Sequence, residues 1–224
     1  MIETLETIGV QFGYNLNAFT SWDCTEYMIK DCPTVDEKNV DLALQILHDW
    51  SQFIELDPKE IDEERGVIKE ELRTRDGAGL RAQNDMIRNL FKGTLYEHRN
   101  LIGYLEGLQS FDQQALVNFY KKWYRPEYQA IVIVGDIDVD VIEAKLKALM
   151  ADIPASPADA AQKVLHKVPA TEQPIISVFS DPELTQSSVM MFARREATPK
   201  ELQNSLGGYF QNVVFNLVSM MMDN

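Results

Sequence analysis

Cysteine and long apolar runs are both scarce in this chain of 224 residues. The two cysteines, Cys24 and Cys32, are too few for a disulfide framework, and the seven residues between them match no zinc-binding spacing. Two separate thiols are the favoured interpretation, with a disulfide as the alternative. The most apolar run near an end, 213–222, is interrupted by Asn216 and Ser219 and falls short of the roughly 20 apolar residues of a membrane-spanning helix. We therefore expect neither a disulfide-stapled domain nor a membrane span.

Positive charge is also in deficit. Lys and Arg total 21 against 35 Asp and Glu, which leaves a formal net charge of −14. Because affinity for nucleic acid comes mainly from Lys and Arg, this balance argues against a nucleic-acid partner and favours basic or neutral peptides. Residues 1–15 contain no basic start followed by an apolar core, so no secretory signal is visible there. The compartment, cytoplasmic or periplasmic, stays open.

Histidine occurs at only three positions, 48, 98 and 166, and no two of them are close in sequence. Neither HExxH nor HxxEH is present, so the chain cannot assemble a zinc site from its own motifs. His48 falls in an expected amphipathic helix, where a surface or core-edge position is favoured. His98 falls in an expected loop, where a solvated position is favoured over a substrate contact.

Helix start signals are clear. A Ser, Thr or Asp that can accept hydrogen bonds from the first amides, followed by Glu, Gln or Pro at the right spacing, predicts a helix N-terminus. The last of the predicted helices is long, with an apolar face from Leu202 to Leu217. Four signals are present: Thr34-x-x-Glu37, opening a helix to about residue 54, Asp57-Pro58-x-Glu60, Ser110-x-x-Gln113 and Thr198-Pro199-x-Glu201.

Strand signals are fewer. Residues 14–20 and 24–30 flank a short polar turn and predict a β-hairpin. The apolar run 129–134, ended by Gly135-Asp136, predicts a buried strand, and 175–179 with 188–193 predict a second antiparallel pair. The expected fold class is therefore α+β, an antiparallel sheet with helices packed on one face.

A break in composition divides the chain. Pro154, Pro157 and Pro169 stand among alanines and polar residues, which is typical of a linker. The predicted domains are 1–152, a linker at 153–173, and 174–224. Because the last part holds only two expected strands and a helix, it looks like the beginning of a second unit rather than a complete one.

The helix expected at 58–73 contains two stacked glutamates. With Ile61 as zero and about 100° per residue, Ile68 and Leu72 fall within about 20° of it. Glu64 and Glu71 fall near 300° and 280°, at the edge of this apolar stripe and one above the other. The neighbouring pair at 63 and 70 falls toward the solvent side.

Two carboxylates inside an apolar stripe need a partner, because a desolvated carboxylate is costly on its own. One interpretation is a buried ion pair with an arginine elsewhere in the chain, and composition alone favours it. The other is a metal ligand with an orienting carboxylate beside it, or a catalytic pair. The residues alone leave both open.

The order of several short motifs resembles the pitrilysin/insulinase family of zinc peptidases, which includes the mitochondrial processing peptidases. Each motif is weak alone, and their collinear order carries the resemblance. The match runs from residue 2 to 136 and more loosely beyond. The segments are Leu5-Glu6-Thr7-Ile8-Gly9, Asn17-Ala18-Phe19-Thr20, Thr25-Glu26-Tyr27, Glu64-Arg65-Gly66-Val67-Ile68-Lys69-Glu70-Glu71, Phe119-Tyr120-x-x-Trp123-Tyr124-Arg125-Pro126, Ile131-Val132-Ile133-Val134-Gly135-Asp136 and Asp181-Pro182-Glu183-Leu184-Thr185-Gln186.

The resemblance implies an inverted zinc motif, HxxEH, whose histidines bind Zn²⁺ and whose glutamate activates water. In the family this motif precedes the Leu-Glu-x-Ile-Gly segment, so here it is expected upstream of Met1, in a longer parent protein. The resemblance further implies that Glu71 is the third zinc ligand and Glu64 a catalytic carboxylate beside it. With one ligand, the isolated chain is expected neither to bind zinc tightly nor to cleave peptides.

The resemblance assigns the remaining site residues to one strand. Asn17, Ala18, Phe19 and Thr20 match the family's edge strand, on which peptide substrate adds as a further strand through main-chain hydrogen bonds. The implied function is a zinc metalloendopeptidase acting on peptides or unfolded segments. The alternatives are a non-catalytic partner subunit of the same family and an acidic α+β binding domain with a structural ion pair.

Association is expected as well. An open sheet edge recruits other strands, and the apolar helix near the C-terminus has too little sheet to cover it. We expect a homo-oligomer, or a heterodimer partner, with exchange of the last helix across residues 151–173 as one route.

Overall fold

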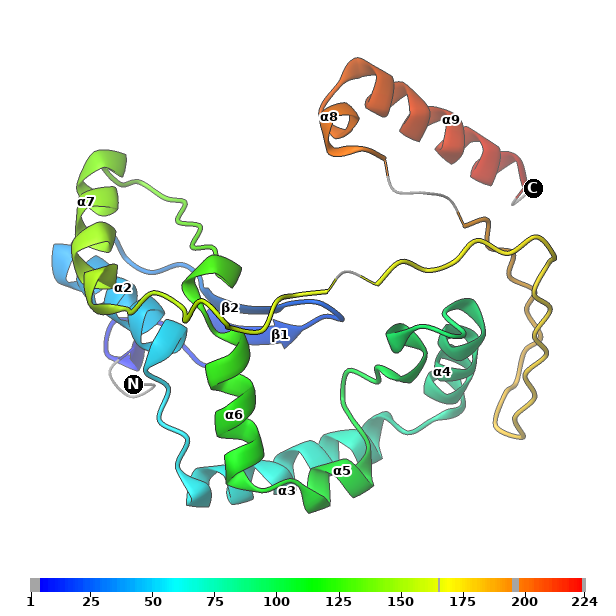
Figure 1. Cartoon of the computed structure of the whole chain (residues 1–224), viewed down its shortest axis with the longest axis horizontal. Helices are drawn as coiled ribbons and strands as arrows, with labels where there is room; N and C mark the ends of the chain where they lie inside the picture. The colour runs from blue at the N-terminus through cyan, green and yellow to red at the C-terminus, as the bar shows by residue number, and fades with distance from the viewer. Residues whose placement is uncertain (1–4, 165, 195–197, 223–224) are drawn as a thin grey trace. The chain divides into compact units, whose positions relative to one another are not determined.

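The computed structural model describes residues 5–164, 166–194 and 198–222. Helices dominate it, and a two-stranded antiparallel sheet lies near the N-terminus (Figure 1). The strands and α-helices are β1 Leu16–Thr20, β2 Thr25–Ile29, α2 Glu37–Gln52, α3 Pro58–Arg75, α4 Ala78–Leu90, α5 Leu105–Ser110, α6 Gln113–Trp123, α7 Val139–Leu149, α8 Lys200–Gln203 and α9 Leu206–Met222, and the 3₁₀ turns are η1 Leu95–His98, η2 Pro126–Tyr128 and η3 Met150–Asp152.

The chain falls into two compact units. The first unit comprises residues 1–169 and 173–184, and the second comprises 170–172 and 185–224. The first unit holds both strands and the helices through α7, while the second holds α8 and α9. The sequence-based division at 153–173 stays a prediction about domains.

A small apolar core joins the N-terminal turn to the hairpin and α2. Leu5 and Val10 are fully buried, and Leu16 of β1 and Ile46 of α2 are 3% and 4% exposed. Partly buried side chains surround these four, including Ile29 of β2 and Trp50 of α2. This core fixes β1 against α2 and gives the predicted α+β arrangement of a hairpin with helices.

The predicted hairpin is confirmed. β1 and β2 pair antiparallel, from Leu16 opposite Ile29 to Thr20 opposite Thr25. The turn between them is closed by the Ser21 amide, which donates to the Cys24 carbonyl at 2.8 Å. Both cysteines are thiols rather than partners in a disulfide.

The start signals were right for α3 and two residues early for α2 and α6. Asp57 caps α3, accepting hydrogen bonds from the amides of the next turn, and Pro58 follows as expected. The caps of α2 and α6 are Asp36 and Asp112, not the predicted Thr34 and Ser110. A carboxylate accepts these amide hydrogen bonds more strongly than a hydroxyl does, and in each case an aspartate was available two residues downstream.

The single long C-terminal helix was a wrong prediction. The chain forms α8, breaks at Asn204 and Ser205, and resumes as α9. The Ser205 hydroxyl accepts from the Gly208 amide at 3.1 Å, which starts the new helix. A side chain at Gly208 would collide with the Leu202 carbonyl, so the break needs glycine there.

The strands predicted at 129–134, 175–179 and 188–193 are also wrong. These residues are described, and they are extended without ladder pairing. Their apolar side chains remain outside any core: Val134 is 92% exposed, Val178 89% and Val189 99%. Branched side chains favour a strand only where a neighbouring strand pairs with it, and the described residues supply none.

Within the described ranges, no helix combines the length and apolar character needed to traverse a bilayer.

Candidate functional site

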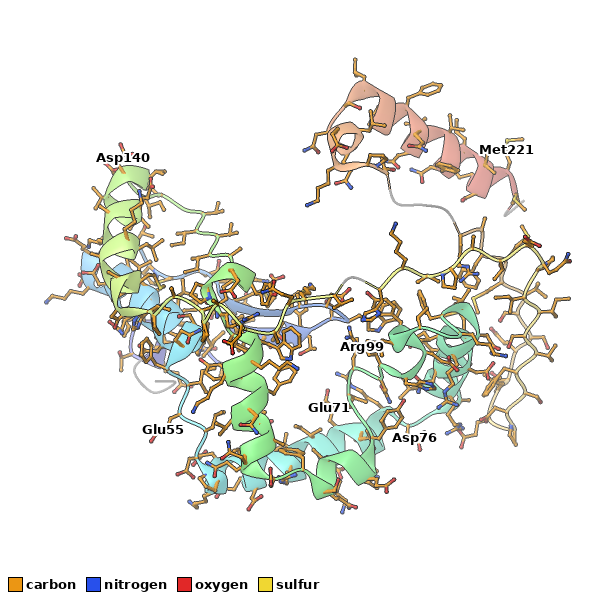
Figure 2. The ribbon with its side chains drawn as sticks, viewed as in Figure 1. Glu55, Glu71, Asp76, Arg99, Asp140 and Met221 are labelled. Atoms are coloured by element: carbon orange, nitrogen blue, oxygen red, sulfur yellow. The ribbon has the colours of Figure 1, made fainter. Side chains whose placement is uncertain are left out.

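Helix α3 carries both glutamates singled out from the sequence. Glu64 and Glu71 are seven residues apart on it, about 10 Å along its axis, and point in nearly the same direction. Figure 2 shows Glu71 on the side of α3 where the β1–β2 hairpin lies. No hydrogen bond or ion pair between described residues joins either glutamate to the segment Asn17–Thr20.

The burial expected for these carboxylates is absent. α3 has no buried residue among its eighteen, and Val67 is 59% exposed. Glu64 is exposed, and the side chain of Glu71 is 43% exposed. The sequence argument that desolvation must be compensated is therefore wrong for this conformation, because the apolar stripe of α3 is only partly covered.

An arginine stands beside Glu71. Arg75 Nη2 lies 2.6 Å from Glu71 Oε1, an i, i+4 pair whose arginine is 63% exposed. Such exposed pairs contribute only about 0.3–0.5 kcal/mol. This exposed pair lies within α3, so it is not the buried ion pair with an arginine elsewhere in the chain that composition favours.

Arg65 holds α3 in place. Its guanidinium donates to the Phe111 carbonyl at 2.6 Å and to the Leu108 carbonyl, both at the end of α5. It also stacks 3.7 Å above the Phe111 ring. Sequence analysis missed this residue, although Arg65 falls within about 40° of Ile61 on the packing side of the helix.

A complete metal site is not formed by the described residues, where no group of three or more His, Cys, Asp or Glu side chains could hold an ion. Glu71 carries a carboxylate of the kind that can bind zinc, but the described residues place beside it no group that would complete a catalytic site. His48 and His98 do not complete it: His48 is buried and paired with aspartates, and His98 is 75% exposed with Glu97 3.8 Å away.

The edge of β1 is suited to strand addition. Lys30 donates to the Asn15 carbonyl at 2.7 Å, and Ser21 to the Cys24 carbonyl at 2.8 Å. Because hydrogen-bonded pairs alternate in an antiparallel ladder, the main-chain N–H and C=O groups of Asn17 and Phe19 also point toward β2. The main-chain groups of Ala18 and Thr20 therefore point to the outer edge. The Ala18 amide donates to the Asn17 side chain at 2.8 Å.

The tip of the hairpin is docked on the loop after α4. Trp22 meets the Phe91 ring edge-on at 4.8 Å between centroids. Asp23 accepts from the Tyr96 hydroxyl at 3.0 Å and from Arg99 at 3.1 Å. The hydrogen bond to Asp23 raises the pKa of Tyr96. These contacts position the outer edge of β1.

The base of the hairpin is held by an aromatic cluster. The hydroxyls of Tyr27 and Tyr124 are 2.6 Å apart, and the Trp50 ring lies tilted against the Tyr27 ring at 5.3 Å between centroids. Burial, followed by the hydrogen bond between the Tyr27 and Tyr124 hydroxyls, raises the pKa of Tyr27 well above its usual value. Tyr120 adds a hydrogen bond to the Trp50 carbonyl at 2.8 Å. The aromatic motif at 119–126 therefore has a structural role, which is to fix β2 against α2 and α6.

A cavity in the first unit lies apart from the predicted site residues. It has a volume of about 320 Å³ and lies between α6 and the segment before α3, with Gln52, Leu56 and Val117 in its lining. None of the six predicted site residues lines it. We assign it no function.

Two family models match the chain, one after the other. Residues 1–101 match the insulinase family, peptidase family M16, and residues 110–216 match the peptidase M16 inactive domain. Glu64, Glu71 and the β1 strand all fall in the first match.

Known proteins give the same result. The probable zinc protease PqqL of Escherichia coli is 30% identical over 87% of this chain and 20% of its own length. The Haemophilus influenzae protein of that name is 33% identical over 66% of this chain and 16% of its own. The chain thus spans about a fifth of the length of these relatives.

A solved structure extends the likeness to the fold. The crystal structure of the first half of the periplasmic protease PqqL from Escherichia coli matches 76% of this chain and 36% of that one, at 32% identity and a TM-score of 0.69. The probable β subunit of the Arabidopsis thaliana mitochondrial processing peptidase is 23% identical over 95% of this chain and 40% of its own length.

Proposed function

The chain belongs to peptidase family M16, and from this we propose that it supplies a zinc ligand and a peptide-binding strand to a zinc metalloendopeptidase that cleaves peptides or unfolded segments. The observation that carries the proposal is the placement of Glu64 and Glu71 on one side of α3, inside the region that matches the insulinase model. The likeness to the solved PqqL half, over 76% of this chain, supports the same fold.

Glu71 is the proposed zinc ligand. Its carboxylate is half-exposed and its Arg75 partner is on the surface. Losing this ion pair when a cation binds therefore costs little free energy. The Arg75 pair contributes about 0.3–0.5 kcal/mol, whereas structural zinc sites bind with about 10–16 kcal/mol. Zinc would supply Lewis-acid activation of water and of the scissile carbonyl.

Glu64 is the proposed catalytic partner. At about 10 Å from Glu71 along the helix it cannot share one zinc ion at a bond length of about 2 Å. Its carboxylate is exposed and in line with Glu71, which suits it to accept a hydrogen bond from a zinc-bound histidine and so set that ring's orientation.

Substrate is proposed to add to the outer edge of β1. Ala18 and Thr20 would form main-chain hydrogen bonds with an extended peptide, and the Asn17 side chain would give up the Ala18 amide it now accepts from. Asn17 and Phe19 project from the same face of the strand, where they would contact alternate substrate side chains.

The 224 residues contain no HxxEH motif. We therefore propose that this chain alone neither binds zinc tightly nor cleaves peptides, and that catalysis needs a segment carrying two histidines and a glutamate.

The test is complementation. The chain is mixed with the region of Escherichia coli PqqL that precedes the matched residues, and zinc affinity is measured by calorimetry alongside cleavage of a quenched fluorescent peptide. We expect no activity from either part alone and activity from the mixture. Glu71→Gln should abolish zinc binding and cleavage together.

Glu63→Gln is the matched control, because Glu63 is an exposed carboxylate of α3 paired with Lys59. It should leave both readouts unchanged. Submicromolar zinc binding by the chain alone, or activity that survives Glu71→Gln, would contradict the assignment.

A second candidate is a non-catalytic partner subunit of the same family. The observation that favours it is the match of residues 110–216 to a domain described as inactive. This candidate predicts that complementation yields a stable complex without zinc binding, and that Glu71→Gln has no effect on it.

A further inference from the structure

Helix α4 presents a polar stripe made of Arg81, Asp85 and Asn89. These residues are spaced by four, so they fall on one side of the helix. All three side chains contact a segment about a hundred residues later in the sequence, which runs as an extended trace beside α4 (Figure 1).

The N-terminal end of the stripe binds carboxylates. Arg81 donates to both oxygens of Asp181, at 2.7 and 3.1 Å, and to Glu183 at 2.6 Å. The Asp181 side chain is only 10% exposed, and the Arg81 hydrogen bonds hold its pKa below the usual range. A fork-like pair of this kind is among the stronger polar contacts.

The C-terminal end of the stripe binds a hydroxyl. Asn89 donates to Ser177 Oγ at 3.0 Å, and Ser177 donates in turn to Asp85 Oδ2 at 3.0 Å. The Ser177 hydroxyl therefore accepts from one member of the stripe and donates to another.

The distance along α4 between the stripe's two ends matches the distance along the segment between the residues they bind. From Arg81 to Asn89 a helix rises about 12 Å, and from Ser177 to Asp181 an extended chain spans about 13 Å. Ser177 and Asp181 are both odd-numbered, so in an extended chain they project to the same side. Glu183 follows in a turn, in which the Leu184 amide donates to the Asp181 carbonyl at 3.1 Å. The segment runs antiparallel to α4, which brings Ser177 to Asn89 and Asp181 to Arg81.

We infer that the stripe on α4 is a docking surface for an extended segment with a hydroxyl four residues before a carboxylate, and that its occupant is this chain's own segment 177–183. The docked segment is the last part of the first unit, which ends at Leu184. Docking therefore sets the point at which the chain leaves the first unit. Arg81 also bonds Asp76 at 3.2 Å, which ties the dock to the end of α3.

The test is limited chymotrypsin digestion of the full chain, followed by mass spectrometry. Cleavage after Phe179, inside the docked segment, requires that the segment detach, so its rate reports the undocked population. Cleavage after Phe192, which is 51% exposed in the second unit, is the internal reference.

Arg81→Gln should raise the Phe179 rate about tenfold relative to the Phe192 rate, because charge-assisted hydrogen bonds are lost. Asp181→Asn should raise it about fivefold. The double variant should be no faster than Arg81→Gln, since the two side chains act as one contact. Gln83→Glu, which makes the same change in charge at an exposed site on α4, should have no effect.

Three results would overturn the inference: a Phe179 rate within twofold of the parent in Arg81→Gln, additive effects in the double variant, or equal acceleration at Phe192. If Arg81→Gln does not fold, Ser177→Ala is used to test the inference instead, because it changes neither a charge nor a residue of α4. It should raise the Phe179 rate about threefold, and an unchanged rate would equally overturn the inference.

Discussion

The two units of this protein differ in what their helices pack against. In the first unit, α2 covers a hairpin and buries Ile46, while α3 is pinned to α5 by Arg65. In the second unit, Gly208 is the one buried residue among those described, and Phe210 is 69% exposed. Local sequence is enough to form a helix, but a core requires partner elements from elsewhere in the chain.

Association of two chains is the largest effect expected. It would bury the apolar side chains of the second unit and so give its helices the packing partners that they lack. The exposed apolar side chains of α9 should drive dimerisation at micromolar concentration. A micromolar dissociation constant corresponds to a binding free energy of about 8 kcal/mol. Light scattering should give twice the 25.6 kDa chain mass. Phe210→Glu should restore the monomer, and Gln211→Glu, its exposed neighbour, should not. A clean monomer of the parent chain would refute this.

Shortening an apolar side chain should destabilise the first unit more than the second. Ile46→Ala removes a side chain that is 4% exposed, and should lower the free energy of unfolding by about 2–5 kcal/mol in urea titrations. Leu217→Ala on α9, where the side chain is 54% exposed, should cost less than about 0.5 kcal/mol at concentrations that keep the chain monomeric. Equal costs would mean that the second unit has a core of its own.

The contact between α3 and α5 should rank next. Arg65→Ala loses two charge-assisted hydrogen bonds and a stacking contact on Phe111, for about 2 kcal/mol. Lys69→Ala, an exposed cation on the same helix, is the control and should be nearly neutral. Urea titration monitored by far-UV circular dichroism measures both. A neutral Arg65→Ala would show that α3 is held by other contacts.

The smallest effect expected is on pH dependence. Burial lowers the pKa of His48, but hydrogen bonds to Asp49 and Asp152, each at 2.9 Å, outweigh it and raise the pKa overall. A raised pKa means that the charged form is favoured by folding, so this stabilisation is complete below the pKa of the unfolded chain. It is lost as the pH rises through the higher folded pKa.

This loss is measured as the free energy of unfolding from mildly acidic to mildly alkaline pH. Asp152→Asn should flatten the dependence, whereas Asp159→Asn, an exposed aspartate with no recorded contact to His48, should preserve it. A flat profile in the parent chain would show that the contacts of His48 do not discriminate between its charge states.

Sequence alone predicted the elements whose signals are local. The hairpin and the start of α3 depend on residues within a few positions of each other, and both were found. The strands at 129–134 and 175–179 failed because a strand needs a partner that local sequence does not reveal. The caps of α2 and α6 failed by two residues because Thr34 and Ser110 competed with better acceptors nearby.

The site was predictable in part for the same reason. The spacing of Glu64 and Glu71 follows from helix geometry, and their shared direction could be derived from it. Their exposure could not, since it depends on what lies opposite α3. Arg65 was missed because its carbonyl acceptors are 43 and 46 residues away. The Arg81 stripe was missed because its partners in the segment 177–183 are 88 to 102 residues away.

The contact between Tyr27 and Tyr124 bears on the order in which the first unit folds. The two residues are 97 positions apart, so their contact closes a long loop, whereas the hairpin closes over a few residues. Loop closure becomes entropically more costly with length, and distant contacts form slowly. We expect the hairpin and α2 to form early, and the aromatic cluster at Trp50 to be completed late, once the chain has been synthesised beyond α6.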